Sequence, residues 1–140
     1  MVDSSDRCFK EYAEALRLSH AVGAELSSAY TNIGMANVNL SCNLEAISWL
    51  EKALAVDKEV YGEQHEHVAT DYYYLGKICH REKEFSKGIE YLSRAIAIHE
   101  RTNNREKIAG FNADLGMVYT DMENYDDVRD ESLRLREARY

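Results

Sequence analysis

The stretch Tyr30-x-x-Ile33-Gly34 decides the fold, because its spacing returns twice further along the chain. The later copies are Tyr72-x-x-Leu75-Gly76 and Asn112-x-x-Leu115-Gly116, so the glycines lie 42 and then 40 residues apart. Around them apolar residues recur at intervals of three, four and seven, which is one face of an α-helix. A period of about 40 residues is typical of arrays of stacked helix pairs.

A second helix is predicted to follow each of these glycines. Twelve and sixteen residues further on, the chain carries small or apolar residues in all but the last place: Ala46, Leu50, Gly88, Leu92, Val128 and Ser132. Each mid-helix glycine costs about 1 kcal/mol of helix propensity relative to Ala. That cost makes sense if a second helix approaches where a Cβ atom would block it. We therefore expect Gly34, Gly76 and Gly116 to lie inside helix pairs.

The repeats predict an all-α fold, a right-handed α-solenoid of antiparallel helix pairs that forms a single domain. With no proline and only seven glycines, a turn-rich β-sandwich is disfavoured. Turns are expected at Gly23, Gly62 and Asn103-Asn104, and helix N-caps at Asn43 and Asn124. The predicted parts are an unpaired N-terminal helix (5–21), repeat 1 (27–60), repeat 2 (69–102) and a capping-like repeat 3 (109–139).

The N-terminal end of the array lacks a partner. Residues 5–21 are in register with the second helix of a repeat whose first helix is missing. This leaves Cys8, Tyr12 and Ala15 as a predicted exposed apolar strip. Either the chain was cut from a longer array or another surface covers the strip, and we expect self-association as a homodimer.

The C-terminal end has a charged face instead. Arg129 and Arg136 stand where the earlier repeats have apolar residues, and Ser132 replaces a leucine. A capping repeat requires such a polar face, so the array is expected to end near Tyr140. Divergence of one repeat inside a longer protein would give the same pattern.

Charge and composition limit the kinds of partner. Seventeen basic against 25 acidic residues give a net charge of -8, which argues against nucleic acid, whose phosphates are neutralised by Lys and Arg. The apolar runs are too short to cross a membrane, and the acidic N-terminus is unlike a signal peptide. Three widely spaced cysteines without a CxxC pair indicate reduced thiols and a cytoplasmic location.

Residues arranged for catalysis are mostly absent. His65-x-His67 could be two arms of a metal site, but no further His, Cys or carboxylate set is spaced to complete it. There is no phosphate-binding glycine loop, and Cys42 and Cys79 fall at turn and core positions rather than in an activating environment. We expect no enzyme activity, no metal and no cofactor.

The repeats resemble the tetratricopeptide repeat, in which small and large residues alternate at these positions. Their length is similar to the longer repeats of kinesin light chains and Pins-type polarity adaptors. The stretch Tyr61–Ala69 is similar to the inter-repeat turn of kinesin light chains, with Glu66 where that family usually has Pro. Ala29–Gly34 is similar to the opening of a Pins-type repeat.

This resemblance implies a non-catalytic scaffold or adaptor that binds a peptide or helix of a partner protein in a concave groove. The ligand expected there carries both basic and apolar anchors. The resemblance places the first helix of each pair on the groove, where these residues are the predicted contacts: Thr31, Asn32, Met35, Asn39, Tyr73, Tyr74, Lys77, Arg81, Asp114 and Met117.

Other functions stay open at this point. Family members that clamp a terminal carboxylate use Lys, Asn and Arg where this chain has Thr31, Met35, Tyr74, Gly110 and Asp114, so that subclass is excluded. The alternative to peptide binding is a structural assembly module that stacks through the strip Cys8, Tyr12 and Ala15. A regulatory domain that senses a signalling peptide is a third reading.

Overall fold

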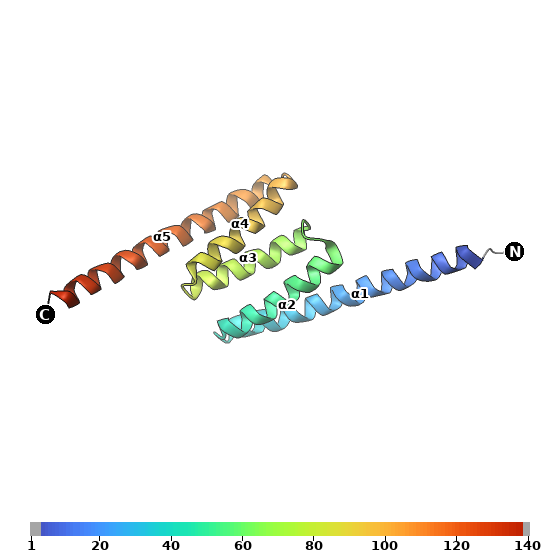
Figure 1. Ribbon diagram of the computed structural model, residues 1–140, viewed down its shortest axis with the longest axis horizontal. Coiled ribbons are helices and arrows are strands. Elements are labelled where there is room, and N and C mark those ends of the chain that lie inside the picture. The colour runs from blue at the N-terminus through green and yellow to red at the C-terminus, as the bar shows by residue number, and fades with distance from the viewer. Residues whose placement is uncertain (1–3, 139–140) are drawn as a thin grey trace. The chain divides into compact units, whose positions relative to one another are not determined.

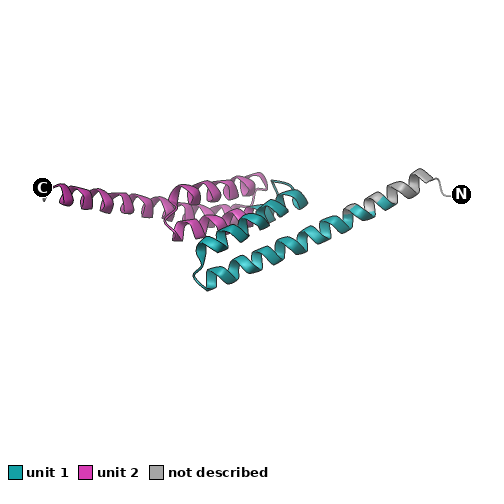
Figure 2. Cartoon of the chain, turned by 60° about the horizontal axis from the view of Figure 1, so that its bottom comes forward, with its two compact units in different colours: residues 1–68 teal, residues 69–140 magenta. Residues whose placement is uncertain are grey.

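The computed structural model describes the backbone of residues 4–138, without the side chains of 4–10, 12, 13 and 16. This part of the chain holds five α-helices and no strand, which confirms the all-α prediction (Figure 1). The helices are α1 (Ser4–Asn39), α2 (Asn43–Tyr61), α3 (Glu66–Arg81), α4 (Phe85–Arg101) and α5 (Arg105–Glu137). The chain forms two compact units, residues 1–68 and 69–140 (Figure 2).

In the first unit α1 and α2 form a helix pair. Gly34 of α1 lies against α2 so closely that a Cβ atom added there would be 3.0 Å from Cγ of Leu50. Leu50 is fully buried, as is Ala46 one turn before it. The rings of Tyr30 and Trp49 meet across the same pair at 5.7 Å. The first predicted glycine contact is therefore confirmed.

The turn expected at Gly23 does not exist. α1 runs through this residue without a break, so residues 5–21 and the first helix of repeat 1 are one helix rather than two. A Cβ atom at Gly23 would lie 2.5 Å from a methyl carbon of Val60. Gly23 is thus a position of close packing between α1 and α2. The prediction was wrong because a glycine at a helix contact and a glycine at a helix end look alike in the sequence.

In the second unit α3 and α4 repeat the arrangement more tightly. A Cβ atom added at Gly76 would lie 2.7 Å from Cγ of the fully buried Leu92, and one added at Gly88 would lie 3.2 Å from the carbonyl oxygen of Gly76. Each helix therefore presents a glycine to the other at the crossing point, which lets the two backbones lie close together. The turn between them passes through Lys83 with a φ of 60°. This pair confirms the second glycine contact.

α5 packs its first half on α4. Phe85 and Leu92 of α4 and Val118 of α5 form a buried cluster, and Leu115 and Met122 pack against its edge. The helix begins at the predicted Asn103-Asn104 turn, where the Asn104 side chain accepts a hydrogen bond from the Lys107 amide at 3.3 Å. This cap satisfies an amide at the helix start that has no partner within the helix.

The third helix pair predicted for 109–139 is absent from the structure. α5 continues through Asn124, which is no N-cap, and a Cβ atom at Gly116 would meet nothing within 4 Å. Asn43 is likewise no N-cap. It is the first residue of α2, and Cys42 occupies the N-cap position. The described residues contain two helix pairs and one long single helix, rather than about three repeats after a separate N-terminal helix.

The sequence after Gly116 explains why α5 does not turn back. Ser132 stands where Leu50 and Leu92 fill the space beside the earlier glycines, so a returning helix would bury less apolar surface. The earlier turns also place Ser41 and Lys83 in the left-handed region, at φ 62° and 60°, which costs roughly 1–2 kcal/mol for residues other than glycine. A straight α5 avoids that cost.

Candidate functional site

The predicted groove residues fall into both units. In the first unit α1 presents Thr31 and Met35 half-buried and Asn32 and Asn39 exposed. They share one side of α1, which differs from the side packed on α2. The other six predicted contacts belong to α3 and α5 of the second unit. There the structure brings several of them together.

Tyr73 is the one of these six side chains that stacks on a ring of α5. Its ring stacks on Phe111 of α5 with centroids 4.2 Å apart and planes 9° from parallel. Partial burial raises the pKa of the Tyr73 hydroxyl, and its hydrogen bond to Asp114 raises that pKa further, while the Lys77 ammonium opposes both effects. Tyr73 therefore packs α3 against α5 as well as lining the surface.

α3 and α5 are joined by two polar contacts. Tyr73 bonds to Asp114, and seven residues later Nε2 of His80 lies 2.6 Å from Oδ2 of Asp121. Seven residues are two helical turns, about 10 Å along the axis. In each contact a residue of α3, the first helix of one repeat, meets a residue of α5, the first helix of the next. Between them Lys77 extends over the Tyr73 ring, its nitrogen 5.4 Å from the centroid.

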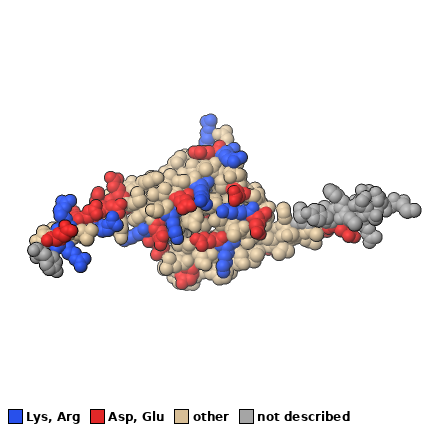
Figure 3. All heavy atoms as spheres, viewed as in Figure 1, with Lys and Arg blue, Asp and Glu red and all other residues tan. Residues whose placement is uncertain are grey.

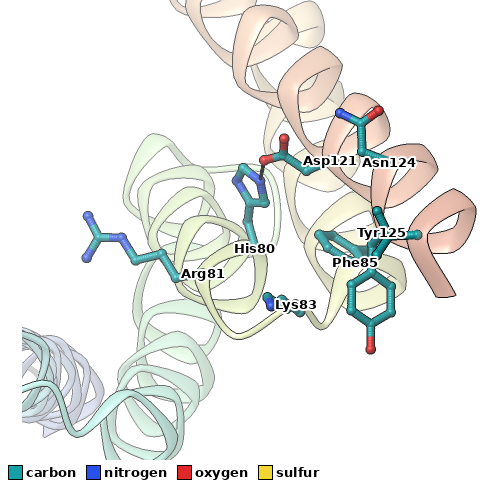
Figure 4. A pocket seen from close by; sticks show the side chains of 8 residues that line it. His80, Arg81, Lys83, Phe85, Asp121, Asn124 and Tyr125 are labelled. Atoms are coloured by element: carbon teal, nitrogen blue, oxygen red, sulfur yellow. Dashed lines mark hydrogen bonds and ion pairs between the residues drawn. The ribbon is translucent and has the colours of Figure 1, made fainter. Parts of the chain in front are cut away.

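A hollow of about 610 Å³ opens beyond the second contact, between the α3–α4 turn and α5 (Figure 4). Phe85 and Tyr125 form its aromatic side, with ring centroids 5.8 Å apart. The Lys83 nitrogen lies 5.6 Å from the Tyr125 ring. Ligand pockets commonly enclose roughly 300–1,000 Å³, so this hollow, though open, has room for several side chains. Its lining is His80, Arg81, Lys83, Phe85, Asp121, Asn124, Tyr125 and Val128.

The acidic side chains near the hollow have partners within the protein, whereas the basic ones at its rim are exposed to solvent. Asp121 is held by His80, and Asp114 accepts from Tyr73, whereas Arg81 and Lys83 are exposed at the rim. Further along α5 acidic and basic side chains intermingle (Figure 3), as in the 3.5 Å pair of Arg129 and Asp126. The rim of the hollow is therefore its cationic part.

The raised pKa of Tyr73 predicts a loss of stability at high pH. The folded chain favours the neutral phenol, so this contribution is complete below the ordinary tyrosine pKa of about 10 and is lost as pH rises through the raised value. Urea unfolding at neutral pH and above about pH 10 should show a larger loss for the natural chain than for Tyr73→Phe. Tyr119→Phe removes an exposed tyrosine of α5 and serves as the control. An equal loss in all three proteins would contradict the assignment.

The predicted self-association strip is only partly visible. Ala15 is exposed on α1, whereas the side chains of Cys8 and Tyr12 lie outside the described residues. Assembly through these three residues stays a prediction.

The histidine pair of the sequence is a stack of rings. His65 and His67 lie with centroids 5.0 Å apart, and each ring centroid is also 4.6 Å from that of Tyr61, stacked for His65 and tilted for His67. The His67 amide donates to Nδ1 of His65, so these ring nitrogens do not converge as zinc ligands do. Across the described chain no group of three or more His, Cys, Asp or Glu side chains is placed to hold a metal.

The described helices were also compared with the length and hydropathy that a membrane span requires. None of them is both long and apolar enough to cross a bilayer.

Sequence reasoning missed part of this site. His80 and Asp121 fall at groove positions of the repeat, but their contact joins residues 41 apart and needs the packing of α5 on α4. The hollow was not predicted, since Tyr125 and Val128 were expected in a returning helix. Phe111 carried a signal, because it is the first aromatic residue of α5.

Comparison with known proteins gives one family and one fold. A family model described as the tetratricopeptide repeat matches residues 25–101. The crystal structure of BtubC (BKLC) from P. vanneervenii is similar at a TM-score of 0.63 and 24% sequence identity, over 90% of this chain and 56% of that one. This chain thus spans little more than half the length of that protein, and the likeness shows the fold alone. A search of curated proteins finds no match.

Proposed function

Because the chain belongs to the tetratricopeptide repeat family, whose members generally mediate protein–protein interaction, we propose that its second unit binds a segment of a partner protein. The segment lies along the surface shared by α3 and α5 and places an apolar side chain in the hollow beside Phe85 and Tyr125. Binding is non-catalytic. The observation that carries this proposal is the hollow itself, because it combines an aromatic side with a polar rim.

The side chains of this surface indicate which residues the partner segment should carry. Lys77 and Met117 lie between or beside the two polar contacts and offer a cation and an adaptable apolar contact. Arg81 and Lys83 at the rim favour an acidic group next to the apolar anchor. The basic anchor predicted from the sequence has Asp114 as its counterpart on the same surface. A partner segment with an apolar residue between charged residues satisfies both.

Affinity capture with mass spectrometry tests the proposal. The double variant Arg81→Glu, Lys83→Glu is expected to lose most of the proteins that the natural chain captures, since the rim changes sign while both positions are exposed. The double variant Arg105→Glu, Lys107→Glu changes charge equally at the exposed start of α5 and should capture the natural set. Identical capture by all three proteins would disprove the role of the hollow.

A further inference from the structure

A row of apolar side chains lies exposed along α1, on a side that neither α2 nor the predicted groove uses. The residues follow one another at intervals of three and four, so they occupy one face of the helix. Leu40 is 74% exposed, Val22 64% and Leu18 51%. We name this the outer face of α1, and it consists of Leu18, Val22, Leu26, Ala29, Ile33, Ala36 and Leu40.

The outer face is also nearly free of charge. Between Leu18 and Leu40 the chain has one charged side chain, Glu25, although 30% of all residues are charged. Solvated helices of globular proteins carry charged residues on their exposed side. Depletion of charge around exposed apolar residues marks the core of a protein interface.

The equivalent positions of α5 are packed against a neighbouring helix. Relative to its glycine, Ile33 of α1 corresponds to Leu115 of α5, and Ala36 corresponds to Val118. In α5 these positions pack on the apolar side of α4, where Val118 is fully buried. The same positions of α1 are exposed in the structure. The outer face therefore has the pattern of a surface that accepts another helix.

We propose that the helix it accepts is the outer face of α1 in a second copy of this chain, antiparallel to the first. The row is self-complementary about Ala29: Leu18 lies opposite Leu40 of the second copy, and Val22 lies opposite Ala36. Leu26 and Ile33 lie three and four residues from Ala29, so they meet offset by one residue, about 1.5 Å along the axis. Ala29 meets its own counterpart at the two-fold axis, where its small side chain lets the helices approach. Such a contact uses the same patch on both subunits, which is the geometry of most homodimers.

Other exposed apolar residues of the described chain fit this face less well. Those of α5 include Val128 and Leu135, but Arg129 and Arg136 lie among them. Burying these arginines against an uncharged row would remove them from water with no opposite charge on the facing helix to offset the cost. Two copies of the uncharged row meet without that cost.

The size of the contact limits its strength. From Leu18 to Leu40 the helix is about 33 Å long, and one helix pair of that length covers less than the roughly 800 Å² per partner of a standard stable interface. The dimer is therefore weak, with a dissociation constant on the order of 10 µM. Its formation does not depend on the proposed partner binding, because that binding uses residues of α3, α5 and the turn before α4.

Sedimentation of the full chain tests the dimer. From about 0.5 to 500 µM, which brackets a dissociation constant near 10 µM, the weight-average mass should rise from near 16.1 kDa toward twice that value. Ala29→Glu places two like charges at the two-fold axis and should weaken the dimer about a hundredfold. Ser28→Glu adds the same charge one residue away, on another side of α1, and should leave the dissociation constant unchanged. Circular dichroism should show that both variants keep their helix content.

Disulfide trapping tests the antiparallel arrangement. With Cys8 and Cys42 replaced by Ser, Ala29→Cys should form a covalent dimer, and a mixture of Leu18→Cys and Leu40→Cys chains should cross-link to each other. Leu18→Cys alone should stay monomeric under oxidation. A natural chain that remains monomeric at the highest concentration overturns the proposal. So does equal disruption by Ser28→Glu and Ala29→Glu, or a covalent dimer of Leu18→Cys.

Discussion

Replacing Leu92 by Ala is expected to lower the stability of the second unit by about 2–5 kcal/mol. Leu92 is fully buried between Gly76 and the cluster of Phe85 and Val118. Its removal leaves a cavity that neither helix can close, because the backbones of α3 and α4 already touch at Gly88. Urea unfolding followed by far-UV circular dichroism measures the loss.

Leu135→Ala is the matched control for this substitution. It removes the same atoms from a side chain that is 64% exposed, so its effect should stay within about 0.5 kcal/mol. If the two substitutions cost the same, Leu92 is not in the core and the α3–α4 pairing described here is wrong.

A single methyl group at Gly76 should also be costly. Its Cβ would lie 2.7 Å from Cγ of Leu92, a branch point that cannot swing away, and 3.3 Å from the carbonyl oxygen of Gly88. Overpacking of this kind costs about 1–3 kcal/mol and outweighs the gain of up to about 1 kcal/mol that Ala brings to a helix. We expect Gly76→Ala to lower both the urea midpoint and the melting temperature.

The opposite sign is expected at Gly110, which serves as the comparison. Gly110 lies inside α5 with nothing within 4 Å of an added Cβ, so Gly110→Ala gains helix propensity without a clash and should raise stability by about 0.5–1 kcal/mol. Stabilisation by both alanines would show that the glycine contact of α3 and α4 is loose.

The periodic part of the fold could be predicted from the sequence, because a helix pair leaves its mark on both members. Gly34 and Gly76 are followed sixteen residues later by a leucine that packs on them, and the structure places both leucines in the core. Gly116 lacks this second half of the pattern, since Ser132 follows it. The missing leucine therefore indicated that the third pair does not form. The glycine at the expected spacing nevertheless led to the prediction of a third pair.

The site was less predictable, because it depends on where helices stop. Residues such as Tyr73 and Lys77 were assigned to one surface by their positions in the repeat. The hollow next to them arises where α5 passes the α3–α4 turn and keeps going. No local pattern distinguishes Asn124 as a helix start from Asn124 as a helix interior residue. The free energy of turning back, set by Ser132 and by the strain of the turn, decides between them.

The straight course of α5 ties the existence of the hollow to helical continuity. Asn124, Tyr125 and Val128 line it from a stretch that runs twelve residues past Tyr125 to Glu137 without a packed neighbour of its own repeat. Fraying or a proline in that stretch would dismantle one wall while leaving the two helix pairs intact. Binding in the hollow should therefore stabilise the C-terminal part of α5. A bound segment should slow amide exchange in residues of α5 that it does not contact.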